Sequence, residues 1–221
     1  MTKEPIQEKT RVHKVCKLAD GTRPPSVTTI LSDVLAKPAL IHWAWDLGTK
    51  GINYRAFRDD LAEVGKLTHK MILTHLKKET LVFDEYSKEV INRAETAFLK
   101  YLEWEGQHRV EPQIVEEPLV SEIHRFGGTP DFLGMVDGKL TLIDFKSSKA
   151  IYDDYFYQLA AYAILHGEGG SIPENYRILR IGRIPEEAFE DRQHNGTLEV
   201  QKKIFLACLE IYKLKKLTKG E

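Results

Sequence analysis

The first half of the chain has apolar residues at helical spacing. They form one face over residues 61–76 and another over residues 90–102, at the three- and four-residue intervals that place side chains on one side of a helix. Two shorter helices are predicted before them, one capped by Ser26 or a nearby threonine and one beginning at Pro38. Residues 1–105 are therefore expected to be mainly helical.

After Gly106 the apolar pattern becomes that of β-strands. Asp137-Gly138 separates two of these segments and is a dipeptide typical of a two-residue hairpin turn. The predicted strands cover residues 108–120, 130–136, 139–146 and 176–181.

Helical spacing returns over residues 153–166 and 198–214. Helices followed by a hairpin, a helix, a strand and a helix predict a mixed α/β (α+β) fold, with a central sheet flanked by helices. We expect one domain over residues 1–221, with residues 106–221 as its sheet-containing core.

Composition narrows the classes of protein only slightly. Hydrophobic residues make up 42% and charged residues 29% of the chain, as in ordinary globular proteins. The net charge of -1 gives no sign of nucleic-acid binding, although such binding needs only a local basic surface. No segment has the ~18 unbroken apolar residues of a membrane span, and residues 1–10 lack the apolar segment of a secretory signal.

The two cysteines argue against thiolate chemistry. Cys16 and Cys208 lie near opposite ends of the chain and have no metal-binding spacing. A zinc site or an iron–sulfur cluster built from this chain's thiolates is therefore not expected. Free thiols are compatible with a reducing cytoplasm, which is the predicted location.

Two carboxylates and a lysine are the strongest candidates for chemistry. In the strand LTLIDFK, Asp144 and Lys146 share one face, while Ile143 and Phe145 point to the other. Hairpin pairing is expected to bring Asp131, near the start of the preceding strand, beside Asp144. Two adjacent carboxylates repel unless a cation lies between them, and Mg²⁺ or Mn²⁺ suits oxygen ligands.

These residues also have an ordinary structural interpretation. Asp144 and Lys146 would then form a surface ion pair on an edge strand, and Asp131 would be a turn residue. The combination of all three in one hairpin favours the metal site, where the lysine would orient a water or neutralise developing charge.

The arrangement resembles the PD-(D/E)XK nuclease superfamily. Pro130-Asp131 matches the PD element, and Asp144-Phe145-Lys146 follows thirteen positions after Asp131 as the D-x-K element. The resemblance implies a restriction-endonuclease-like core that hydrolyses phosphodiester bonds with Mg²⁺ or Mn²⁺. It implies that Asp131, Asp144 and the Phe145 carbonyl bind metal and that Lys146 is catalytic.

Further motifs resemble the RecB-type, lambda-exonuclease-like branch. Gly65 and His69 resemble its G-x-x-H helix, although three residues rather than two separate them, and this resemblance implies that His69 binds metal. Gln158 and Tyr162 match its Q-x-x-x-Y motif. A single helical histidine, or a buried tyrosine beside a solvated glutamine, would be the ordinary alternatives. The resemblance implies DNA contacts for Gln158, Tyr162 and Lys149.

The branch also carries a glutamate before the PD element. Glu116 and Glu117 occupy this region, and because adjacent strand residues face opposite ways, only one can serve. We select Glu117 as the catalytic candidate, with a solvated strand face as the alternative.

The resemblance implies a metal-dependent DNA exonuclease without an iron–sulfur cluster, of phage or recombination and repair type. Its partner would be a DNA single strand or duplex end, the location would be the host cytoplasm if phage-encoded, and a homo-oligomer is compatible with this type. One alternative is a nucleic-acid-binding module with the same fold but no cleavage activity. Another is a small-molecule metal hydrolase. Digestion polarity, DNA against RNA, the number of metals and the oligomeric state stay open.

Overall fold

The computed structural model describes residues 16–170, 172–184, 187–218 and 220, so the expected lead-in before Cys16 lies outside the described residues. Four helices come first along the described chain: α1 (Val27–Val34), α2 (Pro38–Thr49), α3 (Tyr54–Leu76) and α4 (Lys88–Glu105). Three of these helices begin after residues that are preferred at the N-cap position. The side chains of Ser26, Asn53 and Ser87 each accept a hydrogen bond from a backbone N–H of the first turn. The prediction of a helical first half is confirmed.

Strands dominate the next part of the chain, followed by helices that alternate with strands. The elements are β1 (Val110–Val115), β2 (Leu119–Ser121), β3 (Phe126–Gly128), β4 (Phe132–Val136), β5 (Lys139–Lys146), α5 (Asp153–Glu168), β6 (Asn175–Arg180), β7 (Glu190–Asn195) and α6 (Glu199–Thr218).

The main sheet has five strands in the order β1-β4-β5-β6-β7, with β5 at its centre. Strands β5 and β6 are parallel, and the other pairs are antiparallel. Asp137 and Gly138 have φ angles of 52° and 80°, as the predicted tight hairpin turn requires. The mixed sheet and its flanking helices confirm the predicted fold class.

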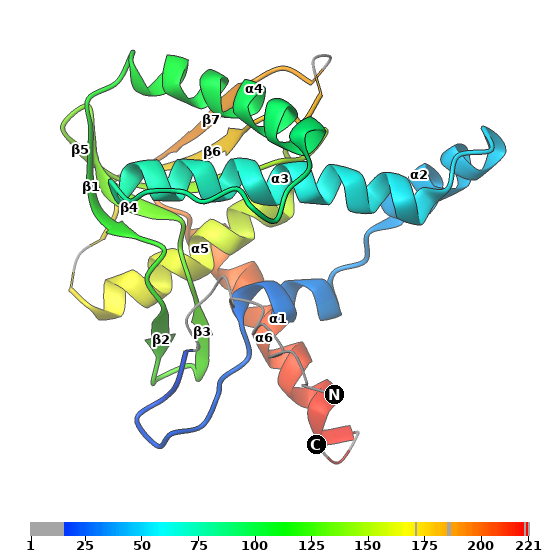
Figure 1. The fold of residues 1–221 in the computed structure, drawn as a ribbon. Coiled ribbons are helices and arrows are strands. Elements are labelled where there is room, and N and C mark those ends of the chain that lie inside the picture. Colours follow the sequence, from blue (N-terminus) through cyan, green and yellow to red (C-terminus); the bar gives the residue numbers. More distant parts are fainter. Residues whose placement is uncertain (1–15, 171, 185–186, 219, 221) are drawn as a thin grey trace, which may run out of the picture.

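Helices cover both faces of this sheet, and each face has its own apolar core (Figure 1). Ile143 and Phe145 of β5 pack with α3 and α4. Leu142 packs on the other face with α1, α5 and α6. The alternation predicted for β5 is therefore confirmed, and Asp144 and Lys146 point to the face that carries α5.

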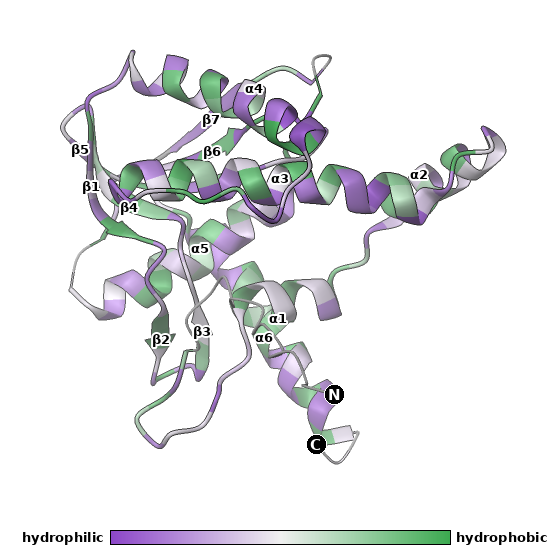
Figure 2. Cartoon of the chain, viewed as in Figure 1, coloured by the Kyte–Doolittle hydropathy of each residue, from purple (hydrophilic) through white to green (hydrophobic). Residues whose placement is uncertain are grey.

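The sheet differs from the prediction in two places. The single strand expected over residues 108–120 is broken, because Glu116 has a φ of 55° and Pro118 follows it, so that β2 leaves to pair with β3. Strand β7 was not predicted because its sequence, EDRQHN, has no apolar alternation, as its hydrophilic colour shows (Figure 2). None of the described helices is long and apolar enough to cross a membrane.

Candidate active site

A cavity of about 630 Å³ opens at the end of β5. The start of α1 and the segment before it, α3, the β3–β4 connection, the end of β5, α5 and α6 all contribute to its lining. The lining residues are Cys16, Arg23, Pro24, Pro25, Ser26, Val27, Thr28, Thr29, His69, Gly127, Gly128, Thr129, Asp131, Asp144, Phe145, Lys146, Gln158, Tyr162 and Tyr212. This volume lies within the roughly 300–1,000 Å³ typical of ligand sites.

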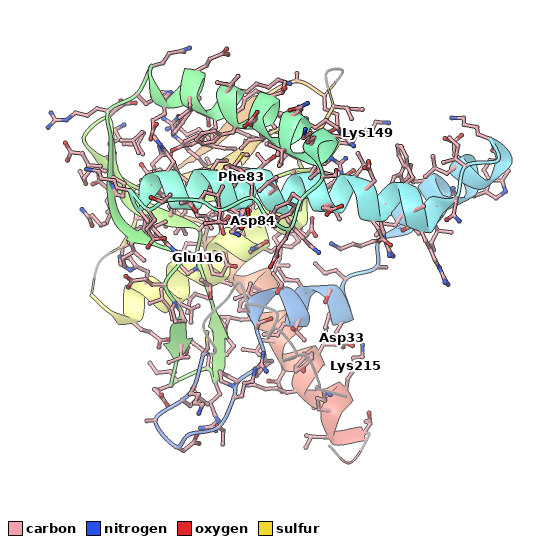
Figure 3. The ribbon with its side chains drawn as sticks, in the orientation of Figure 1. Asp33, Phe83, Asp84, Glu116, Lys149 and Lys215 are labelled. Atoms are coloured by element: carbon pink, nitrogen blue, oxygen red, sulfur yellow. The ribbon has the colours of Figure 1, made fainter. Side chains whose placement is uncertain are left out.

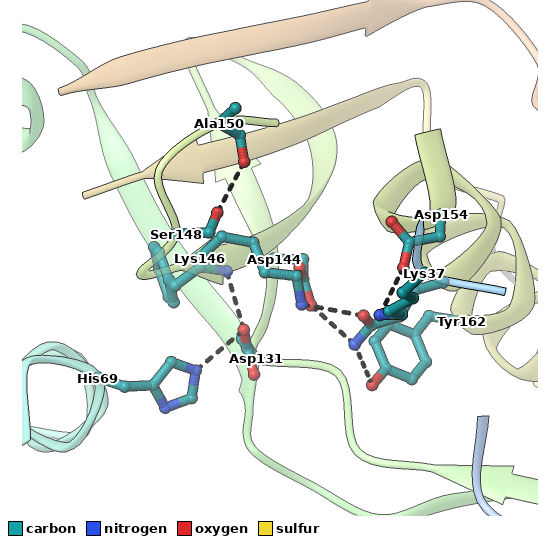
Figure 4. A network of polar contacts seen from close by, with 11 residues as sticks. Lys37, His69, Asp131, Asp144, Lys146, Ser148, Ala150, Asp154 and Tyr162 are labelled. Carbon is teal, nitrogen blue, oxygen red and sulfur yellow. Dashed lines mark hydrogen bonds and ion pairs between the residues drawn. The ribbon is translucent and has the colours of Figure 1, made fainter. Parts of the chain in front are cut away.

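The β4–β5 hairpin brings the two predicted carboxylates to this cavity. Phe132 pairs with Ile143, so the residues just outside this pair, Asp131 and Asp144, lie beside each other. Asp131 Oδ2 accepts the Phe145 backbone N–H at 2.8 Å and lies 3.0 Å from His69 Nε2. His69 on α3 thus contacts the β4–β5 hairpin, as Figure 4 shows, although α3 packs on the face of the sheet opposite to α5.

Lys146 and Gln158 complete the cluster around Asp144. Lys146 Nζ lies 2.5 Å from Asp144 Oδ2 and donates to Gln158 Oε1 at 2.9 Å. Gln158 Nε2 in turn donates to Asp144 Oδ1 at 3.0 Å and to the Tyr162 hydroxyl at 2.9 Å. Both polar ends of the Gln158 amide are therefore engaged, and this residue holds the acid and the lysine in fixed positions.

The pKa values of the two carboxyl groups in the cluster shift in opposite directions. Asp144 is only 1% exposed, and this burial, with the nearby negative charge of Asp131, raises its pKa to about 6 despite the Lys146 ammonium. Burial also opposes ionisation of Asp131, but His69 and Lys146 outweigh it and lower the pKa of that carboxyl. The same attraction raises the pKa of the His69 ring above its ordinary value, against the effect of burial.

Close backbone packing sets the position of His69. Gly65 lies one turn earlier on α3, and a Cβ at this position would come within 2.2 Å of Ser147 Oγ and 2.9 Å of Ser147 Cβ. The Ser147 hydroxyl could rotate away from such a Cβ, but Ser147 Cβ is fixed to its backbone, so a larger residue requires a small separation of α3 from residue 147. Gly65 therefore allows the approach that brings His69 to Asp131.

Not every predicted site residue lies at the cavity. Glu117 is exposed, and neither it nor Glu116 lines the cavity. Glu116 instead forms an ion pair with Lys77 at 2.7 Å. Lys149, labelled in Figure 3, is exposed and does not line the cavity either.

Conversely, the sequence motifs missed part of the cavity wall. Arg23 and the hydroxyl residues at the start of α1 line it, and so does Tyr212 of α6. Ser26 as an N-cap residue predicts that a helix begins here, but it does not predict that this helix lines the cavity. Nothing in the local sequence around Tyr212 indicates that it faces the same cavity as Asp144.

The described part of the chain contains no group of three or more His, Cys, Asp or Glu side chains arranged to hold a metal ion. Asp144 instead faces the Lys146 ammonium. Its Oδ2 atom is buried and has no partner in hydrogen-bond geometry, although the ammonium lies 2.5 Å away. The two groups therefore form an ion pair rather than a well-directed hydrogen bond.

Comparisons with known proteins identify only distant similarities. No protein-family model matches the chain, and no curated protein matches its sequence. Among solved structures, a protein from Eubacterium rectale named as an exonuclease is 11% identical, with a TM-score of 0.49 over 72% of this chain and 68% of that chain. The alkaline exonuclease LHK-Exo from Laribacter hongkongensis is 16% identical, with a TM-score of 0.37 over 90% of this chain and 95% of that chain. Similarities this distant do not assign a function.

Proposed function

We propose that this protein is a metal-dependent deoxyribonuclease of the PD-(D/E)XK type. The observation that carries the proposal is the pair of buried carboxylates, Asp131 and Asp144, in a cavity that also holds Lys146 and His69. An imidazole nitrogen with carboxylate oxygens is a donor set that suits Mn²⁺ or Mg²⁺. The raised pKa of Asp144 is compatible with a cation site, because burial and the negative charge of Asp131 both disfavour its carboxylate form and a bound cation would offset them.

In this proposal Asp131, Asp144, His69 and the Phe145 carbonyl would hold the metal. When bound, such a metal polarises a phosphate and lowers the pKa of a coordinated water. The chain's own residues supply orientation: the Phe145 N–H fixes Asp131, and Gln158 fixes Asp144 and Lys146 together. The positive charge of Lys146 Nζ is thereby held in position before a phosphate binds in the cavity.

An exonuclease acting in DNA recombination or repair is the finer form of this proposal. It is supported by the order of the motifs that contain His69, Asp131, Lys146 and Gln158. DNA contacts by Gln158, Tyr162 and Lys149 stay predictions, as do a catalytic role for Glu117 and assembly into an oligomer.

The test is hydrolysis of two DNA substrates with Mg²⁺, with Mn²⁺ and with excess chelator. An end-labelled linear DNA and a covalently closed circle of the same sequence separate end-dependent from internal cleavage. We expect metal-dependent release of label from the linear DNA and an intact circle. Nicking of the circle would make the enzyme an endonuclease. Cleavage of small phosphate esters but not of DNA, or no cleavage with either metal, would contradict the proposal.

A further inference from the structure

The first half of helix α3 extends beyond the main sheet, toward α2 (Figure 1). The buried residues of α3 begin at Leu61, so the turns before it add no fully buried side chain to a core. Helix α2 packs on these turns through Trp43, whose ring contacts Tyr54 and Phe57. The side of α3 away from these contacts is open to solvent.

This open side of α3 leads to the cavity. His69 lines the cavity, and Arg55, Ala62 and Lys66 precede it by fourteen, seven and three residues. These intervals return to the same side of a helix, and all three residues are exposed. At a rise of about 1.5 Å per residue, Lys66 lies about 4.5 Å and Arg55 about 21 Å before His69 along the helix axis.

The acidic residues Asp60 and Glu63 lie on a different side of α3. Asp60 pairs with Arg93 of α4 at 2.9 Å. Burial and the negative charges of Glu85 and Glu63 raise the pKa of Tyr86. Because Tyr86 packs against the apolar core between α3 and α4, Glu63 also lies on the side that faces α4. The side of α3 that carries His69 is therefore left with cations.

Arg55 and Lys66 are the cations on this side whose charges are not balanced by a neighbour. Within the described chain, neither forms a hydrogen bond, an ion pair or a cation–π contact. Arg58 lies on the same side but pairs with Asp59 at 2.6 Å, so these two residues add no net charge. Neither Arg55 nor Lys66 lines the cavity. They form a line that begins one helical turn from His69 and leads away from it.

We propose that Arg55 and Lys66 form a track for the phosphate backbone of the DNA that leaves the cavity, with each side chain pairing with one phosphate. This inference rests on the proposed function and assigns DNA contacts that no motif assigns. Basic side chains on phosphates supply affinity that does not depend on sequence and fix the position of the DNA. Their separation of about 16 Å along α3 corresponds to about five nucleotides of one duplex strand.

The first test measures the salt dependence of binding by fluorescence anisotropy in Ca²⁺, with a blunt duplex and with a single strand. Arg55→Ala and Lys66→Ala should each reduce the slope of log affinity against log salt by about 0.9 on the duplex or about 0.7 on the single strand. The double variant should lose twice as much. Both residues are exposed, so thermal melting should show that the variants stay folded.

Lys203→Ala is the matched control for these variants. Lys203 is an exposed lysine of α6 without a partner in the described chain. It precedes Tyr212, which lines the cavity, by nine residues, and this interval places it on the opposite side of α6. Its replacement should leave the slope unchanged. Equal slopes for wild type, Arg55→Ala and Lys66→Ala, or an equal loss in Lys203→Ala, would overturn the track.

Oligonucleotide length tests the order of the contacts along α3. Affinities of the wild type and of each variant are compared on single strands of graded length, from a few nucleotides upward. The loss caused by Lys66→Ala should reach its full size on shorter strands than the loss caused by Arg55→Ala, because Arg55 lies about 16 Å farther from His69. The same length dependence for both variants would contradict the track.

Cleavage kinetics separate failure of this inference from failure of the proposed function. If the wild type cleaves DNA, the double variant should have a raised KM and a nearly unchanged kcat, because neither side chain touches the reacting phosphate. An unchanged KM in an active enzyme would overturn the track alone. A wild-type protein that neither binds nor cleaves DNA would overturn both proposals.

Discussion

Two clusters of buried charge lie on adjacent strands of the same sheet. At the end of β5, Asp144 and Lys146 meet Asp131 and His69 at an open cavity. Between β6 and β7, Arg177 pairs with Asp191, which also accepts the Trp104 indole N–H at 2.9 Å. Both clusters contain buried polar atoms without a hydrogen bond, so this feature alone does not mark a functional site.

The clusters differ in charge balance and in access. Glu190, beside the second cluster, is only partly buried, and Arg180 and Arg192 outweigh the effect of that burial and lower its pKa. In the first cluster burial dominates and raises the pKa of Asp144 to about 6. The β6–β7 ion pairs are absent from the cavity lining. Two neighbouring carboxylates at an open cavity, one of them almost completely buried, are thus what distinguish the candidate active site from a structural ion pair.

Replacing one buried cation in each cluster tests this distinction most strongly. Lys146→Met should lower the cleavage rate by roughly 10²- to 10³-fold with the protein still folded, because a fixed positive charge is lost from the cavity. Arg177→Met removes a side chain that is 7% exposed and leaves Asp191 without its cation, so it should cost roughly 3–5 kcal/mol of stability.

The measurement is single-turnover cleavage together with chemical denaturation. Activity per folded molecule should fall only for the Lys146 variant, whereas the free energy of unfolding should fall for both variants, because each leaves a carboxylate without its cation. If Arg177→Met lost the same fraction of activity at full folding, the two clusters would not differ in function.

One substitution should disturb the close packing of α3 against the end of β5, and a second should restore it. Gly65→Ala should lower activity by about 100-fold, because a shift of order 1 Å misplaces His69. Adding Ser147→Gly removes both atoms that the new Cβ would meet, and should restore most of the loss. Gly48→Ala on α2 is the control, since its Cβ meets nothing within 4 Å. Activity of Gly65→Ala equal to wild type would refute the positioning role.

His69 separates the RecB-type interpretation from the wider superfamily. His69→Ala should lower activity by roughly 10- to 100-fold at limiting metal, and excess Mn²⁺ should recover part of it. Its ring must lose a proton to bind metal, and its raised pKa predicts that activity rises with pH through a value above the ordinary one. Because metal and proton compete, more Mn²⁺ should move this rise to lower pH. Superimposable metal titrations of the two proteins would exclude the ligand role.

Metal binding should also be visible without any substrate. At a concentration 100 times its Kd, a bound ion stabilises the folded protein by about 2.7 kcal/mol. Mn²⁺ should therefore raise the melting temperature of the wild type but not that of Asp131→Asn. Asp191→Asn, in the structural cluster, should keep the Mn²⁺ response. A response retained by Asp131→Asn would place the metal elsewhere.

Short-range pattern explains which parts of the site could be predicted. The Asp137-Gly138 turn sets the hairpin register, and that register alone places Asp131 beside Asp144. Likewise, the four-residue spacing of Gln158 and Tyr162 on α5 was sufficient to predict that they meet. Each of these inferences depends on residues fewer than fifteen positions apart.

Long-range packing decides the parts that could not be predicted. Tyr212 and Arg23 reach the cavity only because α6 and α1 pack beside α5, and no local pattern encodes that packing. Strand parity also could not decide between Glu116 and Glu117. The left-handed backbone at Glu116 interrupts the alternation of faces, so counting residues along the strand no longer gives the side.

The central claim is that Asp131 and Asp144 form a metal site that cleaves DNA. Its most direct test is cleavage of an end-labelled linear DNA during a Mn²⁺ titration, with wild type and Asp144→Asn compared on folded protein of equal concentration. The substitution keeps the size of a side chain that is 1% exposed but removes its charge. We predict metal-saturable cleavage by the wild type, none in excess chelator, and none by Asp144→Asn at any Mn²⁺ concentration. Identical titration curves for the two proteins would contradict the claim.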